Sequence, residues 1–216
     1  MHTDRPEQSP EEETRKTPLN ESSLKPLVIR PLGLQFHSPY LDVDAAELVW
    51  PAREKPEEGG KPVRHVHYRI VRRDAVAVLA YAQDQDAFVL VEQFRYPAAA
   101  KGEDVLLEIP AGVIEDGEQP EATAARELRE EAGVTLRELA LMTTAFASPG
   151  YSDERLMLYY GTVDRFIDEG GGVDIGERTR RCLLPRTQAW ELWTQGRIRD
   201  LKTFAALAWF FARQSP

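Results

Sequence analysis

Hydrophobic and polar residues change their spacing near residue 75, where the chain becomes rich in apolar, β-branched stretches. Residues 75–82 and 87–94 are two such stretches separated by four polar residues, which predicts two strands joined by a turn. Shorter apolar stretches predict further strands at residues 105–109, 139–147 and 156–163. Helical spacing predicts helices at residues 120–132, 187–195 and 201–213. Helices interleaved with strands in this irregular order indicate an α/β sandwich.

The chain before residue 75 has a different character. Residues 1–26 carry four prolines, a run of three glutamates and few apolar residues, which predicts a disordered acidic tail. In residues 27–75, Val66, Tyr68 and Ile70 alternate with polar residues, as in a half-buried strand. The Pro- and Gly-containing residues 54–61 predict a turn or loop. We expect residues 27–75 to form a β-rich subdomain that packs on the rest of the chain or on a second subunit, because they hold few core residues.

Composition narrows the class of protein. Hydrophobic residues make up 42% of the 216 residues, which is enough for a core, and the net charge of −9 argues against binding nucleic acid through a basic surface. Cys182 is the one cysteine, so no intrachain disulfide can form, and its apolar neighbours predict a buried, inert thiol. No apolar run approaches the roughly 20 residues of a membrane span, and no secretory signal is evident. We expect a cytoplasmic protein without membrane contact.

The helix predicted at residues 120–132 has an acidic ridge. At about 100° per residue, Glu127, Glu130 and Glu131 fall within one arc of roughly 100°. The opposite side carries the expected packing residues Ala125, Leu128 and Ala132. Such a ridge is compatible with a solvated helix face, or with a site for hard divalent cations, which prefer oxygen ligands. A glycine-containing loop with Glu118 just before the helix favours the cation site.

These residues form a motif. Gly112 is followed after five residues by Glu118, after seven more by Arg126-Glu127-Leu128, and after one residue each by Glu130-Glu131 and Gly133-Val134. The segment resembles the Nudix box at every specified position. The resemblance implies a Nudix-type α/β/α sandwich around a mixed sheet. It also implies a hydrolase that cleaves a nucleoside diphosphate linked to another moiety, using Mg²⁺ or Mn²⁺.

The resemblance also implies a role for each residue of the motif. Glu127 and Glu131 match the metal-binding pair, and Glu130 matches the third acid, which binds metal or orients water. Arg126 matches the arginine that fixes Glu130 through a salt bridge. Two further positions are less uniform: Glu118 matches a site of metal contact or loop support, and the carbonyl of Ala111 matches a backbone metal ligand.

Sequences that flank the box resemble the ADP-ribose pyrophosphatase branch of the family. They are Glu92-Gln93-Phe94-Arg95, Glu108-Ile109-Pro110-Ala111-Gly112, the segment 148–154 with Pro149 fifteen residues beyond Val134, and Asp200-x-Lys202-Thr203. By this resemblance Arg95 contacts substrate phosphates, and Glu154 acts as general base or orients the water. Ser148 and Gly150 shape the loop around the terminal ribose. From the residues alone, Arg95 could instead form a surface ion pair, and Glu154 could be an ordinary loop acid.

The branch is typically homodimeric, with N-terminal strands that complete the partner's adenine pocket. Four aromatic residues of this segment are candidates to stack on the base, although packing in a core or dimer interface is the more usual role for each: Phe36, Tyr40, Trp50 and Tyr68. Two features depart from the branch. The arginine expected before the strand at residue 75 could be Arg69, Arg72 or Arg73, of which we name Arg69 as the substrate contact. Residues 177–181 are basic where relatives carry acids.

The Nudix box indicates the reaction but not the substrate. GDP-mannose pyrophosphatases share much of the flanking pattern, so GDP-mannose or another nucleotide sugar is an alternative to ADP-ribose. A different class of protein, a catalytically silent Nudix ligand sensor, would be expected to have a broken acidic ridge. The ridge is intact here, which favours an enzyme. A nucleoside triphosphatase is disfavoured by the long N-terminal segment and by Pro149.

Overall fold

The computed structural model describes residues 26–52, 60–172 and 178–213. The expected disordered tail and most of the loop at residues 54–61 therefore lie outside the described residues. Contacts divide the chain into two units. Of the described residues, the first unit comprises 26–35, 44–52 and 60–68, and the second comprises 36–43, 69–172 and 178–213.

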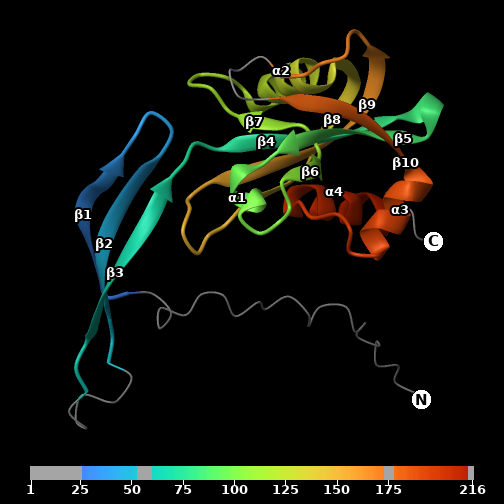
Figure 1. Cartoon of the computed structure of the whole chain (residues 1–216). Helices are drawn as coiled ribbons and strands as arrows, with labels where there is room; N and C mark the ends of the chain where they lie inside the picture. Colours follow the sequence, from blue (N-terminus) through green and yellow to red (C-terminus); the bar gives the residue numbers. More distant parts are fainter. Residues whose placement is uncertain (1–25, 53–59, 173–177, 214–216) are drawn as a thin grey trace, which may run out of the picture. The chain divides into compact units, whose positions relative to one another are not determined.

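A three-stranded sheet forms most of the N-terminal region (blue to cyan in Figure 1). Its strands lie in the order β1 (Val28–His37), β2 (Asp42–Trp50) and β3 (Val63–Val71). The amide of Ser38 donates to the carbonyl of Leu41 at 2.9 Å and closes the turn between β1 and β2. The structure corrects the expectation of a half-buried strand, because Tyr68 is 61% exposed and β1 is exposed along its whole length. Alternation alone does not tell whether anything covers a face.

The second unit is built on a seven-stranded sheet. Five strands lie in the order β10-β5-β4-β9-β8, while β6 pairs with β5 and β7 pairs with β4. Their bounds are β4 (Ala75–Ala82), β5 (Ala87–Phe94), β6 (Val105–Glu108), β7 (Ala111–Val113), β8 (Val134–Phe146), β9 (Arg155–Phe166) and β10 (Thr179–Pro185). The sheet is mixed, because β4 pairs in parallel with β9 and antiparallel with β5 and β7. A 3-10 turn at Gln83–Gln85 joins β4 to β5, where the polar residues predicted a turn.

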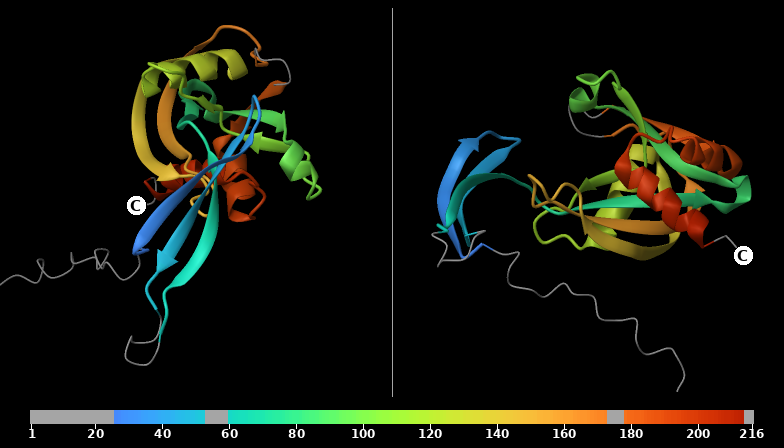
Figure 2. Two further views of the ribbon diagram at one scale, coloured as in Figure 1. Left: turned by 90° about the vertical axis from the view of Figure 1, so that its left-hand side faces the viewer. Right: turned by 90° about the horizontal axis from the view of Figure 1, so that it is seen from below.

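Helices cover both faces of this sheet, as Figures 1 and 2 show. On one face α2 (Pro120–Ala132) packs with Leu128 against Val76 and Val78. On the other face α3 (Arg186–Thr194) and α4 (Leu201–Ala212) pack against Ala77 and Leu79. Successive residues of a strand point to opposite faces, so β4 contributes to both cores. The predicted α/β/α sandwich around a mixed sheet is confirmed.

Local signals place the helix that bears the acidic ridge. Pro120 lies at its first position, and Gly133 follows its end with φ of +62°. This left-handed conformation suits glycine, and a Cβ at Gly133 would also lie 2.3 Å from the carbonyl oxygen of Asp168. The packing face was predicted one residue off, since Ala124 is fully buried and Ala125 is exposed. The ridge itself is turned partly inward, as the site below shows.

Other differences from the sequence pattern are short elements. The described chain has a one-turn helix α1 (Tyr96–Ala99), and the strands β1, β2, β7 and β10 have no counterpart among the elements that spacing predicted. They escaped prediction because they are short or lack regular apolar alternation. Cys182 lies on β10 and is half-buried rather than buried. Among the helices of the described residues, none combines the length and the apolar character that crossing a membrane requires.

Candidate active site

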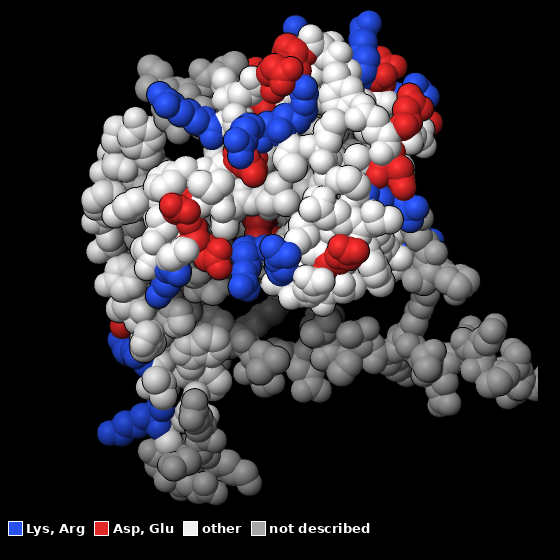
Figure 3. Space-filling model, turned by 45° about the vertical axis from the view of Figure 1, so that its right-hand side comes forward, with Lys and Arg blue, Asp and Glu red and all other residues white. Residues whose placement is uncertain are grey.

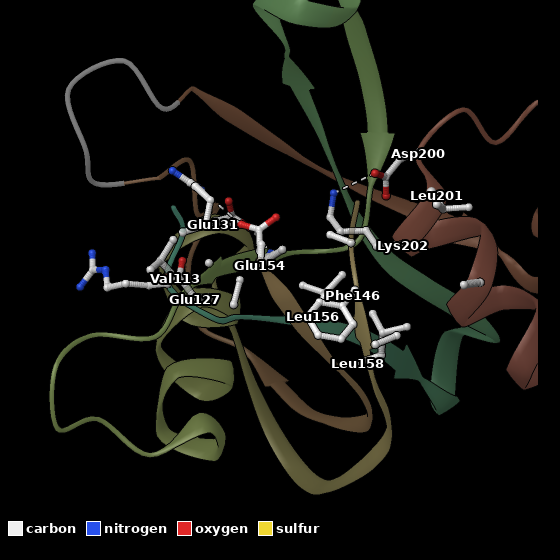
Figure 4. Close-up of a pocket in the computed structure, with 18 of the residues that line it drawn as sticks. Val113, Glu127, Glu131, Phe146, Glu154, Leu156, Leu158, Asp200, Leu201 and Lys202 are labelled. Carbon is white, nitrogen blue, oxygen red and sulfur yellow. Dashed lines mark hydrogen bonds and ion pairs between the residues drawn. The ribbon is translucent and has the colours of Figure 1, made fainter. Parts of the chain in front are cut away.

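A cavity of about 740 Å³ opens in the second unit beside α2. Its walls come from the start of β4, β7, α2, the end of β8, the start of β9 and the N-terminus of α4. In the view of Figure 4, Glu127, Glu131 and Glu154 group on one side, and Lys202 lies on the other with Asp200. The apolar side chains of Phe146, Leu156 and Leu158 also line it. Segments far apart in the sequence therefore meet here.

Two carboxylates of α2 are nearly removed from solvent at this cavity. Glu127 is 9% exposed and Glu131 is 3% exposed. The amide of Ala111 donates to Oε2 of Glu131 at 3.0 Å, which ties the helix to β7. Buried carboxylates are costly unless positive charge or donors compensate them. The solvated-face interpretation of the ridge is therefore wrong for Glu127 and Glu131, whereas Glu130 is half-buried and lines the cavity.

Arg126 supplies part of that compensation. Its guanidinium donates to both oxygens of Glu118 at 3.0 and 3.1 Å, to Glu127 at 2.7 Å and to Glu130 at 3.2 Å. The expected pair with Glu130 is present, but Arg126 contacts three carboxylates instead of one. Its hydrogen bond, followed by one from Thr123, lowers the pKa of Glu118 to about 2. Glu118 does not line the cavity, so its geometry favours loop support over metal contact.

Basic side chains also line the cavity. Arg72 donates to Glu154 at 3.4 Å, and Arg73 lies 3.9 Å from Glu115. Figure 3 shows basic and acidic side chains interspersed over the face that it draws, without a surface of one sign. In the cavity, positive charge comes from separate Arg and Lys side chains that lie among acidic ones.

Arg95, the predicted phosphate contact, lines the cavity and also pairs with Glu108. Its Nε and Nη2 donate to the two carboxylate oxygens at 2.9 and 2.8 Å. The hydrogen bond to Glu108, partly opposed by burial, raises the pKa of Arg95. The ion-pair alternative is thus present in the structure, although Glu108 is 2% exposed and the pair is not a surface pair. Contact with substrate stays a prediction.

The loop between β8 and β9 places only part of the predicted set at the cavity. Glu154 lines it, as expected for a general base, but Ser148 and Gly150 do not. Arg69 also lies outside the lining and donates to Asp153 at 3.1 Å. Among the three candidate arginines before residue 75, Arg72 and Arg73 are the ones at the cavity. Substrate contact by Ser148, Gly150 and Arg69 therefore stays a prediction.

Sequence reasoning missed two features of the lining. Lys202 was part of a matched motif but received no role, although its ammonium faces Glu108 and Asp200 at the cavity. Phe146, at the end of β8, is 57% exposed beside Leu156. The polar residues Asp200, Lys202 and Thr203 at the start of α4 could have indicated that Lys202 belongs to the site. No local signal marked Phe146, because an exposed aromatic at a strand end resembles a core residue in sequence.

The donor set fits a hard divalent cation completed by a ligand. Within residues 26–52, 60–172 and 178–213, no three His, Cys, Asp or Glu side chains converge closely enough to cage a cation by themselves. Mg²⁺ is commonly bound by one or two carboxylates together with substrate phosphates and water. The buried carboxylates of Glu127 and Glu131 could supply oxygen ligands of such a site, and Glu130 and Ala111 also line the cavity.

The α/β/α fold and this site define a class of protein. Acidic residues on one helix, a further carboxylate on an opposite loop and several guanidinium groups surround a cavity large enough for a nucleotide-sized molecule. That combination suits metal-assisted hydrolysis of a polyanionic substrate.

Comparisons with known proteins agree with this class. Residues 71–174 match the NUDIX domain. The chain is 34% identical over 141 residues to an ADP-ribose pyrophosphatase of Bacillus subtilis (strain 168), covering 65% of this chain and 74% of that protein. It is 33% identical over 152 residues to a GDP-mannose pyrophosphatase of Cronobacter sakazakii (strain ATCC BAA-894), covering 68% of this chain and 78% of that protein. The chain therefore belongs to the Nudix family and is a Nudix hydrolase.

A solved structure supports the fold independently. The crystal structure of an ADP compounds hydrolase superposes with a TM-score of 0.68, over 89% of this chain and 96% of that chain. The two sequences are 21% identical, so this likeness concerns the fold alone.

Proposed function

We propose that this protein hydrolyses the diphosphate bond of ADP-ribose, or of a related ADP-sugar, to AMP and ribose 5-phosphate. The observation that carries the proposal is the placement of the buried Glu127 and Glu131 beside the loop carboxylate Glu154 in one cavity. The 34% identity to a protein named ADP-ribose pyrophosphatase supports the choice of substrate.

Glu127, Glu131, Glu130 and the carbonyl of Ala111 would hold Mg²⁺, with Mn²⁺ as a substitute. When bound, the cation neutralises the diphosphate and lowers the pKa of a coordinated water. Arg126 keeps the acidic side chains of α2 in place through its contacts with Glu127 and Glu130. The chain thus provides a fixed arrangement of charge, which needs little rearrangement during the reaction.

Glu154 would accept a proton from the attacking water. The water oxygen forms a bond to one phosphorus, the bridging P–O bond breaks, and the two phosphate products separate. Arg72 contacts Glu154 at 3.4 Å and thereby orients this carboxylate. Arg95 lines the cavity and would bind phosphate oxygens that face away from the acidic helix.

A second candidate substrate is GDP-mannose. The chain resembles a protein named GDP-mannose pyrophosphatase at 33% identity, which is close to its identity with the ADP-ribose pyrophosphatase. The metal ridge and Glu154 would serve both substrates equally, because only the base and the sugar differ.

The test is release of AMP or GMP from a small panel with Mg²⁺ or Mn²⁺: ADP-ribose, ADP-glucose, GDP-mannose and a nucleoside triphosphate. Glu131→Gln, which is isosteric but uncharged, is measured beside the wild type. We expect preference for ADP-ribose, and a loss of at least about 100-fold in the variant. Preference for GDP-mannose would keep the mechanism and replace the substrate. No turnover of any substrate would contradict the proposal and favour a ligand sensor.

We also infer that the chain forms a homodimer through its three-stranded sheet. Apolar side chains are exposed along one face of β1, including Leu32 at 51%, Leu34 at 57% and Phe36 at 53%. Contiguous exposed apolar residues of this kind mark interaction surfaces. A second copy of this chain is the occupant that the family resemblance suggests.

A further inference from the structure

A partly buried network of two cations and two carboxylates lies on the wall of the cavity. Arg95 donates to both oxygens of Glu108, and Lys202 donates to Oε2 of the same carboxylate. Lys202 also donates to Oδ1 of Asp200 at 3.0 Å. Arg95 and Lys202 line the cavity, whereas Glu108 is 2% exposed and lies behind them. One buried oxygen atom thus holds two positively charged groups together.

The network is anchored in the fold on both sides. Asp200 precedes α4, and its Oδ2 accepts from the amide of Thr203 at 2.9 Å and from its hydroxyl at 2.5 Å. The hydroxyl of Thr203 in turn accepts from the amide of Ile109 at 2.8 Å. Glu108 and Ile109 are consecutive, so α4 is joined to the strand end that leads to Ala111. Hydrogen bonds from Thr203 therefore hold Asp200 in place, and the bond from Ile109 to Thr203 holds α4 next to Glu108.

The charges of the network are matched to its burial. Burial, the largest influence on Glu108, raises the pKa of this carboxyl. The hydrogen bond from Arg95 and the positive charges of Lys202 and Arg95 outweigh it, so the pKa lies below its ordinary value. Glu108 is therefore ionised at neutral pH. Arg95 and Lys202 are partly buried from solvent, and without a counter-charge they would repel each other. An ionised Glu108 supplies that counter-charge.

We propose that Glu108 is a positioning residue which holds Arg95 and Lys202 side by side as one anion-binding pair for the diphosphate of the substrate. This inference rests on the proposed function and assigns Lys202 a role beside Arg95. The acidic ridge of α2 would repel any phosphate oxygen not bound to a cation. Two held cations on the wall provide the compensating charge for those oxygens. A guanidinium binds phosphate as a fork and an ammonium as a point charge, so the pair suits a diphosphate.

Two other roles for the network make different predictions. If it only braces α4 against β6, its loss lowers stability without changing the recognition of phosphate. If Glu108 competes with the substrate for Arg95, removing its charge strengthens anion binding. If it positions the pair, removing its charge weakens anion binding while leaving the binding of an uncharged nucleoside unaltered.

The test compares the binding of ADP and of adenosine by calorimetry, in EDTA, so that neither a metal ion nor turnover contributes. We expect the wild type to prefer ADP. Lys202→Gln removes one cation and leaves the Arg95–Glu108 pair in place, and it should reduce this preference about 10-fold or more. Glu108→Gln should do the same. In the double variant that combines Lys202→Gln and Glu108→Gln, the preference for ADP should fall little further than in the more affected single variant, because both changes act through one pair.

Controls separate positioning from folding. Lys202→Arg keeps the charge and should restore much of the preference for ADP. Asp86→Asn breaks an ion pair with Arg186 at 2.7 Å, whose residues do not line the cavity, and should leave the preference unchanged. Thermal unfolding of every variant shows whether it is folded. Should Glu108→Gln fail to fold, Lys202→Gln and Lys202→Arg carry the test.

The inference is overturned if Lys202→Gln keeps the wild-type preference for ADP, or if Glu108→Gln binds ADP more tightly. Equal binding of ADP and adenosine by the wild type would overturn it as well. Because the assay needs no hydrolysis, an enzyme that shows the expected pattern but does not cleave ADP-sugars would refute the proposed function alone.

Discussion

A Cβ atom at Gly112 would lie 1.9 Å from Cδ of Glu127, so the carboxylate of this metal-ligand candidate packs directly on the glycine backbone. The requirement for glycine here is one of space, because Gly112 is not among the residues with positive φ. The Nudix motif thus couples its first residue to the middle of the helix through contact.

Gly112→Ala should displace Glu127 and lower kcat/KM by about 100-fold or more, with a higher Mg²⁺ concentration needed for half-maximal activity. It should also destabilise the fold by about 1–3 kcal/mol, as overpacking commonly does. Denaturant unfolding of Gly112→Ala, Glu127→Ala and the double variant checks the cause. We expect the double variant to be about as stable as Glu127→Ala, since the clash is then gone. Additive losses of stability would contradict this explanation.

The pair of Glu118 with Arg126 predicts a pH dependence of stability. The pKa of Glu118 falls from 4.5 to about 2 in the folded protein. A lowered carboxyl pKa contributes stability that is fully present above about pH 4.5 and is lost as the pH falls towards 2. Glu118→Gln should therefore be less stable than the wild type at pH 7, with the difference vanishing near pH 2. Thermal unfolding across this range checks the prediction, and a difference that is independent of pH would refute it.

Glu154→Gln should lower kcat by about 10²–10⁴-fold with little change in KM, because a general base acts on the chemical step. The Mg²⁺ concentration for half-maximal activity should stay the same, in contrast to Glu131→Gln. Glu103→Gln is the matched control, since Glu103 is also a loop acid and pairs with Arg199 at 3.3 Å outside the cavity lining. Steady-state kinetics of the three variants measure kcat, KM and the Mg²⁺ dependence. A Glu154→Gln variant with normal kcat would assign the general base to another residue.

Leu34→Glu should convert the proposed dimer to a monomer, since it places a charge among the exposed apolar residues of β1. Light scattering after size-exclusion chromatography measures the mass. Gln35→Glu introduces the same charge at the adjacent position, whose side chain points to the other face of the strand, and should retain more of the dimer. A wild type that is monomeric at micromolar concentration would rule out this use of the sheet.

Cys182 offers a probe of the second unit. Burial, with a smaller contribution from Glu92, raises the pKa of the thiol. Because the thiolate is the reactive form, alkylation by iodoacetamide near pH 8 should be slower in the folded protein than in the chain unfolded in urea. The count of one cysteine makes the measurement unambiguous. Equal rates of alkylation in the folded and unfolded protein would show that Cys182 on β10 is accessible to solvent.

The local features of the site were predictable because they depend on neighbours in the sequence. Pro120 and Gly133 delimit α2, and a helical period brings Glu127 and Glu131 to adjacent turns. The position of Glu130 within reach of Arg126 follows from the same period. Residues 105–109 likewise read as a strand because their apolar stretch is local, and β6 ends within one residue of that prediction.

Other features required the folded chain, because they join residues that no local pattern relates. Lys202 and Glu108 are separated by 94 positions, and their contact depends on how α4 meets the end of β6. Likewise, only the packing of α2 on the sheet shows that Glu131 is buried while Ala125 is exposed. The sequence by itself determined the family, the acidic helix and the kind of chemistry, since short-range spacing encodes all three. Tertiary structure decided which charges share the cavity, because burial and long-range ion pairs exist only once the sheet and its helices have packed.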